Sequence, residues 1–196
     1  MRASAVPVIA STLLVVSLVG AGAGTDDQYP ADITPPPGTR YPCALTPLPH
    51  GLPGIPEADR RYINRTYTVI LRATQAKLVV LKAIEEGGPL QDPLSRYELT
   101  MRSLEARLRS EAPPEGLRAF QDDVVAALGL QRAFFTAAVP LRQGGASMSD
   151  VYRIPEGKQA SQRLLSAWGR MQSRYAAWSR ETADSIYHHL CALDLF

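Results

Sequence analysis

The sequence predicts an all-α protein, an up-down-up-down four-helix bundle with a Pro-rich N-terminal strap and one disulfide. Apolar residues recur at spacings of three and four in four long segments, which is typical of amphipathic helices. Alternation of apolar and polar residues, the mark of a strand, is nowhere sustained. Most of the Gly- and Pro-containing connections are short, and short connections make consecutive helices antiparallel neighbours.

Residues 1–23 have the features of a secretory signal peptide. Arg2 precedes an apolar stretch that is strongest over residues 11–18, and Ala21-Gly22-Ala23 fits a small-x-small cleavage site. The alternative is an uncleaved membrane anchor, but the apolar run is short of the ~20 residues that span a bilayer. We therefore expect cleavage before Gly24 and export of the mature chain, to the periplasm or out of the cell.

Residues 24–56 are rich in proline and are expected to form an extended lead and strap. Proline fixes φ and has no N–H to donate, so this stretch suits neither a helix nor a central strand. Four apolar residues in its second half are candidates for packing against the helices: Leu45, Leu48, Leu52 and Ile55.

The two cysteines, Cys43 and Cys191, predict one disulfide, because an even pair in an exported protein is typically bonded. The bond would join the strap to the end of the last helix. In an up-down bundle that end lies at the same pole as the start of the first helix, so the pairing fits the topology. A zinc site with His50, His188 and His189 is the alternative, and its ligand spacing is poor.

The first two predicted helices cover residues 56–86 and 92–111. Gly87-Gly88-Pro89 ends the first, and Asp92-Pro93 begins the second. The predicted core stripe of the first helix is Ile63, Tyr67, Ile70, Thr74, Leu78 and Leu81. The predicted core seam of the second is Leu94, Tyr97, Met101, Leu104 and Leu108.

The third and fourth predicted helices cover residues 114–139 and 155–190, and residues 141–154 are expected to form a loop with one turn at most. The stripe of the third helix is Leu117, Phe120, Val124, Ala127, Leu128, Gln131, Phe134, Phe135 and Ala138. The stripe of the fourth is Leu164, Trp168, Met171, Tyr175, Trp178, Thr182, Ile186 and His189 or Leu190. Its aromatic residues at helical spacing are more typical of a core than of a ligand pocket.

Glu181, Asp184 and His188 are the candidates for a metal site, since their spacing places them on one face of the fourth helix. The same face continues through Arg170 and Arg174, which favours a solvated surface. The paired Glu-x-x-His motifs of di-iron bundles are absent. We therefore predict no metal, no cofactor and no catalytic residues.

The sequence predicts a non-catalytic exported helix bundle that acts through surface interactions with a protein or envelope partner. The 21 basic and 19 acidic residues nearly balance, which does not indicate nucleic-acid binding. No transmembrane segment is expected after signal cleavage. A small-molecule or metal-binding bundle is one alternative. The other is an exported helical enzyme of chorismate-mutase-like layout, with Arg61, Arg72 and Lys82 as its charged set, although their spacings do not match.

Overall fold

The computed structural model describes residues 44–194. The predicted signal peptide, the first part of the Pro-rich lead and Cys43 lie outside the described residues, as do the last two residues. Within the described range the chain forms helices and no strands, so the all-α prediction is confirmed. The helices are α1 (Glu57–Glu86), α2 (Gln91–Ser110), α3 (Arg118–Gln143), α4 (Met148–Val151), α5 (Pro155–Arg174) and α6 (Arg180–Cys191).

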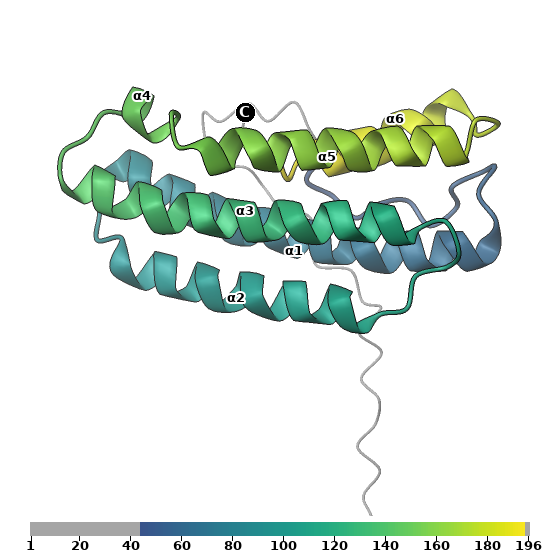
Figure 1. Cartoon of the computed structure of the whole chain (residues 1–196), viewed down its shortest axis with the longest axis horizontal. Coiled ribbons are helices and arrows are strands. Elements are labelled where there is room, and N and C mark those ends of the chain that lie inside the picture. Colours follow the sequence, from purple (N-terminus) through teal and green to yellow (C-terminus); the bar gives the residue numbers. More distant parts are fainter. Residues whose placement is uncertain (1–43, 195–196) are drawn as a thin grey trace, which may run out of the picture.

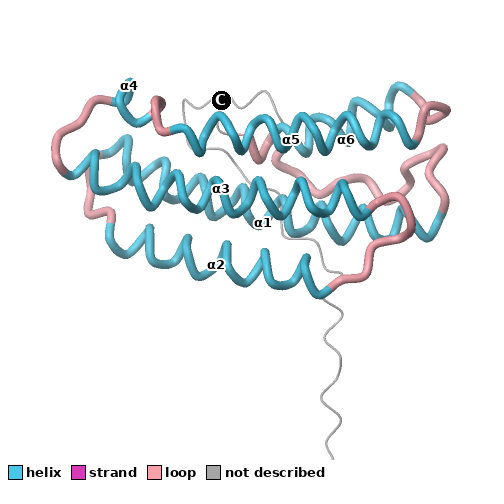
Figure 2. The backbone as a smooth tube through the Cα atoms, viewed as in Figure 1, coloured by secondary structure: helices cyan, strands magenta, loops and turns pink. Residues whose placement is uncertain are grey.

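The long helices α1, α2, α3 and α5 lie side by side, and each runs opposite to the one before it (Figure 1). The most extensive helix contact is between α3 and α5, followed by α1 with α2 and α2 with α3. The short helix α6 turns back along α5 and contacts α1 as well (Figure 2). Helices α1 and α5 do not contact each other through their backbones, and α6 lies against both of them.

The predicted core stripes of α2 and α3 are buried along their full length. Their centre is an aromatic group in which Tyr97 meets Phe135 edge-to-face, with ring centroids 4.9 Å apart, and Phe135 meets Phe134 at 5.1 Å. The stripe of α1 is likewise buried, except that Leu81 is half-buried. Helix periodicity alone was therefore enough to find most of the core.

The ends of α3 differ from the prediction. The helix begins at Arg118, four residues later than expected, because Pro114 to Leu117 form a turn in which the Leu117 N–H donates to the Pro114 carbonyl. It continues through Pro140 to Gln143. The connection after it contains one turn, α4, as expected, and Ser147 and Asp150 cap that turn reciprocally.

Helix α3 is also the one helix among the described residues that is long and apolar enough to cross a membrane by length and composition. Half of the qualifying window is buried inside the molecule, and α3 packs against both α2 and α5. The core helix of a bundle passes the same test.

The prediction of one continuous helix over residues 155–190 is wrong. The chain leaves the helix at Tyr175 and enters α6 at Arg180, where the Ser179 hydroxyl accepts the Thr182 N–H as an N-cap. No Gly or Pro lies in this turn. Instead, the Tyr175 hydroxyl donates to Asp59 at 2.5 Å, and Gly54 of the strap packs against the Trp178 backbone. These tertiary contacts hold the reversal.

The strap, residues 44–56, lies against the helices, and its four predicted apolar residues are buried. The Ala44 N–H donates to the His188 carbonyl of α6 at 3.1 Å, and the Thr182 hydroxyl donates to the Pro53 carbonyl at 3.1 Å. Gly54 adopts a φ of 86°, and a Cβ there would lie 2.9 Å from the Trp178 Cα, so this close approach requires glycine. The strap is thus a structural part of the helical domain.

Lys77 of α1 is a buried cation, with a relative exposure of 2%, at the end of α6. Its ammonium donates to the carbonyls of Ala192 at 2.8 Å and Asp194 at 2.5 Å. Burial lowers the pKa of Lys77 to about 8, and the charge of Asp194 opposes part of this shift.

We expect the free energy of unfolding to rise with pH between about 8 and 9.5, by about 1–2 kcal/mol. The folded pKa of Lys77 lies below the unfolded value, so the unfolded chain binds more protons in this window. Urea unfolding at the two pH values measures the rise. Lys77→Met, which has no titrating group, should remove it. An equal rise in Lys77→Met would show that another group is responsible.

Candidate functional site

The predicted metal candidates do not form a site. Glu181, Asp184 and His188 all lie on the exposed surface of α6, and Asp184 pairs with Arg180 at 3.6 Å. Among the described residues, no group of three or more His, Cys, Asp or Glu side chains is arranged to hold a metal ion. For the predicted disulfide, Cys191 ends α6, and its pairing with Cys43 stays a prediction.

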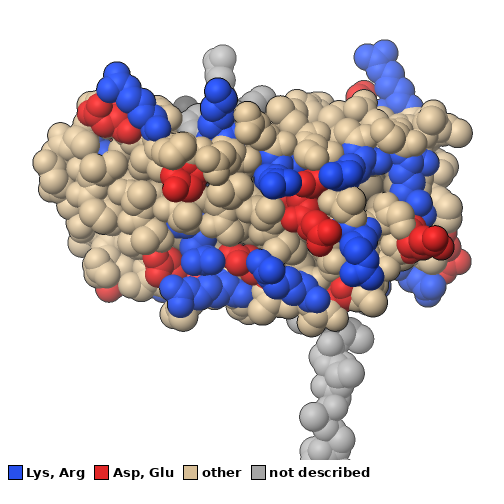
Figure 3. All heavy atoms as spheres, viewed as in Figure 1, with Lys and Arg blue, Asp and Glu red and all other residues tan. Residues whose placement is uncertain are grey.

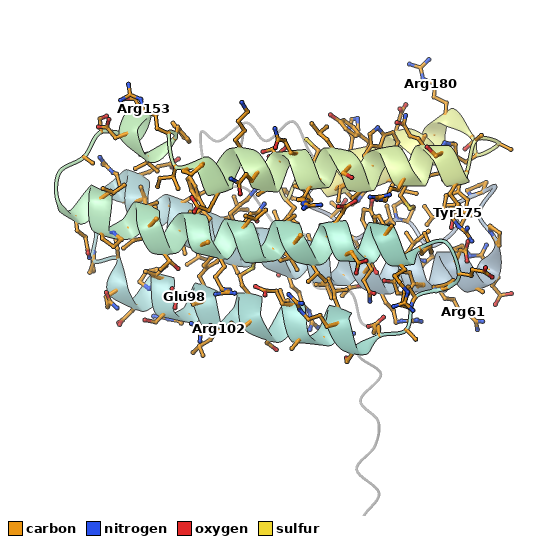
Figure 4. The ribbon with its side chains drawn as sticks, in the orientation of Figure 1. Arg61, Glu98, Arg102, Arg153, Tyr175 and Arg180 are labelled. Atoms are coloured by element: carbon orange, nitrogen blue, oxygen red, sulfur yellow. The ribbon has the colours of Figure 1, made fainter. Side chains whose placement is uncertain are left out.

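The three residues of the enzyme alternative are not gathered in one pocket. Arg61 lies at the start of α1 and pairs with Glu57, and Lys82 lies near its end and pairs with Glu86. Both are exposed i, i+4 pairs, and Figure 4 shows Arg61 directed away from the body of the protein. Arg72 lies between them on the helix and is half-buried.

The most organised polar cluster connects α3 to α5 through Asp123, which is 2% exposed. Its carboxylate accepts hydrogen bonds from Arg163 at 3.1 Å, Ser166 at 2.8 Å and Arg170 at 2.6 Å. Burial alone would raise the pKa of Asp123, but these three donors outweigh it and hold the pKa below its ordinary value. The carboxylate is therefore ionised, and it accepts hydrogen bonds from two guanidinium groups.

A second buried carboxylate, Asp59 of α1, lies at the same end of the molecule. The same Asp59 oxygen accepts from Arg174 Nε at 3.1 Å, from Arg174 Nη2 at 2.9 Å and from the Tyr175 hydroxyl at 2.5 Å. In Figure 4, Tyr175 lies at the end of α5 and faces the start of α1. Hydrogen bonding to Asp59 thus fixes the position of the last arginine of α5.

Arg170 and Arg174 border an open groove of about 680 Å³ between the start of α3 and the second half of α5. Its lining consists of small and basic residues: Gly116, Ala119, Ser166, Gly169, Arg170, Ser173 and Arg174. Gly116 has a φ of 83°, and a Cβ there would lie 2.1 Å from Arg174 Nη1. Glycine suits this position because other residues rarely adopt so positive a φ, and a side chain there would displace the guanidinium of Arg174.

The charges of the groove are layered. The side chains of Asp59 and Asp123 are 7% and 3% exposed, whereas those of Arg163, Arg170 and Arg174 are 55%, 47% and 34% exposed. Figure 3 shows basic side chains along the boundary of α3 and α5, with acidic side chains among them. The two aspartates therefore lie beneath the guanidinium groups, which are the more exposed partners.

The sequence interpretation assigned Arg170 and Arg174 to a solvated face and missed their buried partners. One signal was available for Asp123, which is three residues after Phe120 and therefore lies on the apolar stripe of α3. A carboxylate on a core stripe requires a partner from a neighbouring helix. No comparable signal marked Asp59, since an acidic residue in the first turn of a helix is commonplace.

Comparison of the chain with protein-family models, curated proteins and solved structures finds no match.

Proposed function

We propose that this is an exported, non-catalytic helix-bundle protein that acts through its surface, and that the groove between α3 and α5 binds anionic groups of its partner. The observation that carries the proposal is the layered charge of the groove. Two buried aspartates orient Arg170 and Arg174, which are partly exposed and line an open depression. A guanidinium held in place by one carboxylate loses little conformational entropy when it binds a second anion.

The donors of Arg170 suit this role. Its Nε donates to Asp123, which leaves the two Nη groups to face a ligand at the groove. Guanidinium groups bind carboxylate, phosphate and sulfate oxygens through paired hydrogen bonds. The N-terminal end of α3, which begins at Arg118, adds the positive end of a helix dipole beside the same groove.

The composition of the groove supports binding over catalysis. Its lining contains glycine, alanine, serine and arginine, but no histidine, cysteine or carboxylate to serve as a general base. The groove is also open to water, whereas electrostatic catalysis acts most strongly where water is excluded. A surface that attracts an anionic partner needs neither feature.

Export and the disulfide belong to the same proposal. The Ala44 N–H bond to the His188 carbonyl holds the residue after Cys43 against the last turn of α6, the helix that ends at Cys191. This closeness supports a Cys43–Cys191 bond, which would form in an oxidising compartment. It also supports a bundle of α1, α2, α3 and α5 with alternating directions, closed by α6 and the strap.

Arg170→Gln should weaken binding of dextran sulfate about tenfold, because it removes charge-assisted hydrogen bonds at the groove. In this variant Asp123 still accepts hydrogen bonds from Arg163 and Ser166, so the fold should be retained. Isothermal titration calorimetry measures the affinity, and it should fall as salt is added.

The matched control is Arg153→Gln, which removes the same charge from a side chain that is 78% exposed near α4, away from the groove. It should change the affinity by less than about twofold, since a distant surface charge contributes little. Equal losses in the two variants would indicate attraction by net charge alone and would contradict a specific groove. Circular dichroism melts of both variants check that each is folded.

A further inference from the structure

Aromatic side chains gather on the outer side of the α5–α6 hairpin. The rings of Trp168 on α5 and Trp178 in the turn stack with centroids 5.6 Å apart and planes 20° apart. Tyr187 of α6 lies against Trp168 at 5.3 Å. Leu165 and Tyr187 are 57% and 39% exposed, and both tryptophans are partly exposed. We call these four residues the aromatic surface.

A small depression lies in the aromatic surface between α5 and α6, and Trp168, Tyr187 and Cys191 border it. Apolar area left in water costs about 25 cal/mol per Å². A contiguous group of exposed rings therefore often marks a docking site, whereas a single exposed apolar residue is common and needs no explanation. The sequence interpretation placed Trp168 and Trp178 in the core, and their partial exposure is the feature that needs an explanation.

The chain enters the described structure beside this surface. Ala44 donates its N–H to the carbonyl of His188, the neighbour of Tyr187 on α6. Three consecutive prolines, at positions 35–37, lie seven to nine residues before Ala44. A polyproline II segment advances about 3.1 Å per residue, so these prolines have a reach of roughly 20–30 Å. Since Tyr187 and Trp168 are in ring contact, this reach covers the aromatic surface.

We propose that the aromatic surface is the docking site of the chain's own Pro-rich lead, residues 30–42, with the prolines at 35–37 packed on Trp168 and Tyr187. Proline-rich segments bind aromatic-lined grooves because the polyproline II conformation is preformed and loses little entropy on binding. Attachment through Ala44 makes the association intramolecular, which raises the effective concentration of the segment. The proposal is independent of the arginine groove on α3 and α5.

The two tryptophans of the chain are both in the aromatic surface, so tryptophan fluorescence, excited selectively over tyrosine, reports on it alone. In the mature, oxidised protein, Pro35→Ala, Pro36→Ala and Pro37→Ala are introduced together. Loss of docking uncovers the indole rings, so acrylamide quenching should increase about twofold and the emission maximum should shift to the red. Unchanged quenching and emission in the triple variant would overturn the proposal.

Pro89→Ala, in the connection between α1 and α2 at the far end of the molecule, is the control and should leave the emission unchanged. Leu195→Ala with Phe196→Ala tests the last two residues as occupants. If that variant, and not the proline variant, increased quenching, the lead would be the wrong occupant. Quenching should also be independent of protein concentration, because a decrease on concentrating would assign the surface to a second copy of the chain.

Discussion

Replacing Cys43 and Cys191 with serine should lower the free energy of unfolding of the exported protein by up to about 5 kcal/mol. The two positions are 148 residues apart (191 − 43), so the predicted bond would close a loop around nearly the whole helical domain. Constraining so long a loop removes much of the conformational entropy of the unfolded chain. The loss is comparable to the net stability of many domains, about 5–15 kcal/mol.

Urea unfolding of the oxidised parent and of the double-serine variant measures this loss. The parent with a reducing agent is the control, and it should unfold at the midpoint of the variant. Non-reducing peptide mapping of the exported chain should show one Cys43–Cys191 cross-link and a first residue at Gly24. Free thiols in protein taken from an oxidising compartment, or a dimer linked through these cysteines, would contradict the predicted pairing.

Tyr97→Ala should destabilise the protein by about 3–5 kcal/mol, the second largest expected effect. Tyr97 is 1% exposed, and its ring packs edge-to-face on Phe135 between α2 and α3. Truncation removes this contact and leaves a cavity that the surrounding helices fill only in part. Thermal and urea unfolding both measure the change.

Tyr97→Phe is the matched control, because it keeps the ring and removes only the hydroxyl. Within the described part of the chain that buried hydroxyl has no hydrogen-bond partner, and burial raises the pKa of Tyr97. An unpaired buried polar group costs stability, so Tyr97→Phe should be neutral or stabilising by up to about 1 kcal/mol. A large loss in Tyr97→Phe would mean that the hydroxyl, and not the ring, contributes the stability.

The sequence by itself determined the secondary structure class and most of the core. The seam from Leu94 to Leu108 in α2 and the stripe of α3 were predicted residue by residue, because burial of one helix face repeats every three to four residues. The apolar residues among the prolines of the strap marked the positions that would be buried if the strap were held against the helices, and these positions are buried. All of these features depend on patterns within short stretches of chain.

Tertiary structure alone decided where the chain reverses after α5. The apolar stripe from Leu164 to Leu190 continues through the turn with the same spacing, since α5 and α6 both bury one side against the rest of the molecule. The sequence pattern therefore predicted one helix. The reversal depends on Asp59 and Gly54, which are more than 100 residues away along the chain and touch Tyr175 and Trp178.

The candidate site was decided in the same way. Arg170 and Arg174 lie on the outer face of α5 by their spacing. Only the packing of α5 on α3 brings Asp123 beneath Arg170, and only the tertiary structure brings Asp59 of α1 to Arg174. Helix periodicity indicates which face of a helix is polar, but it carries no information on which helix lies alongside. An ion pair between two helices is a property of the packed structure. Whether a carboxylate on one helix meets a guanidinium on another depends on how the helices pack against each other.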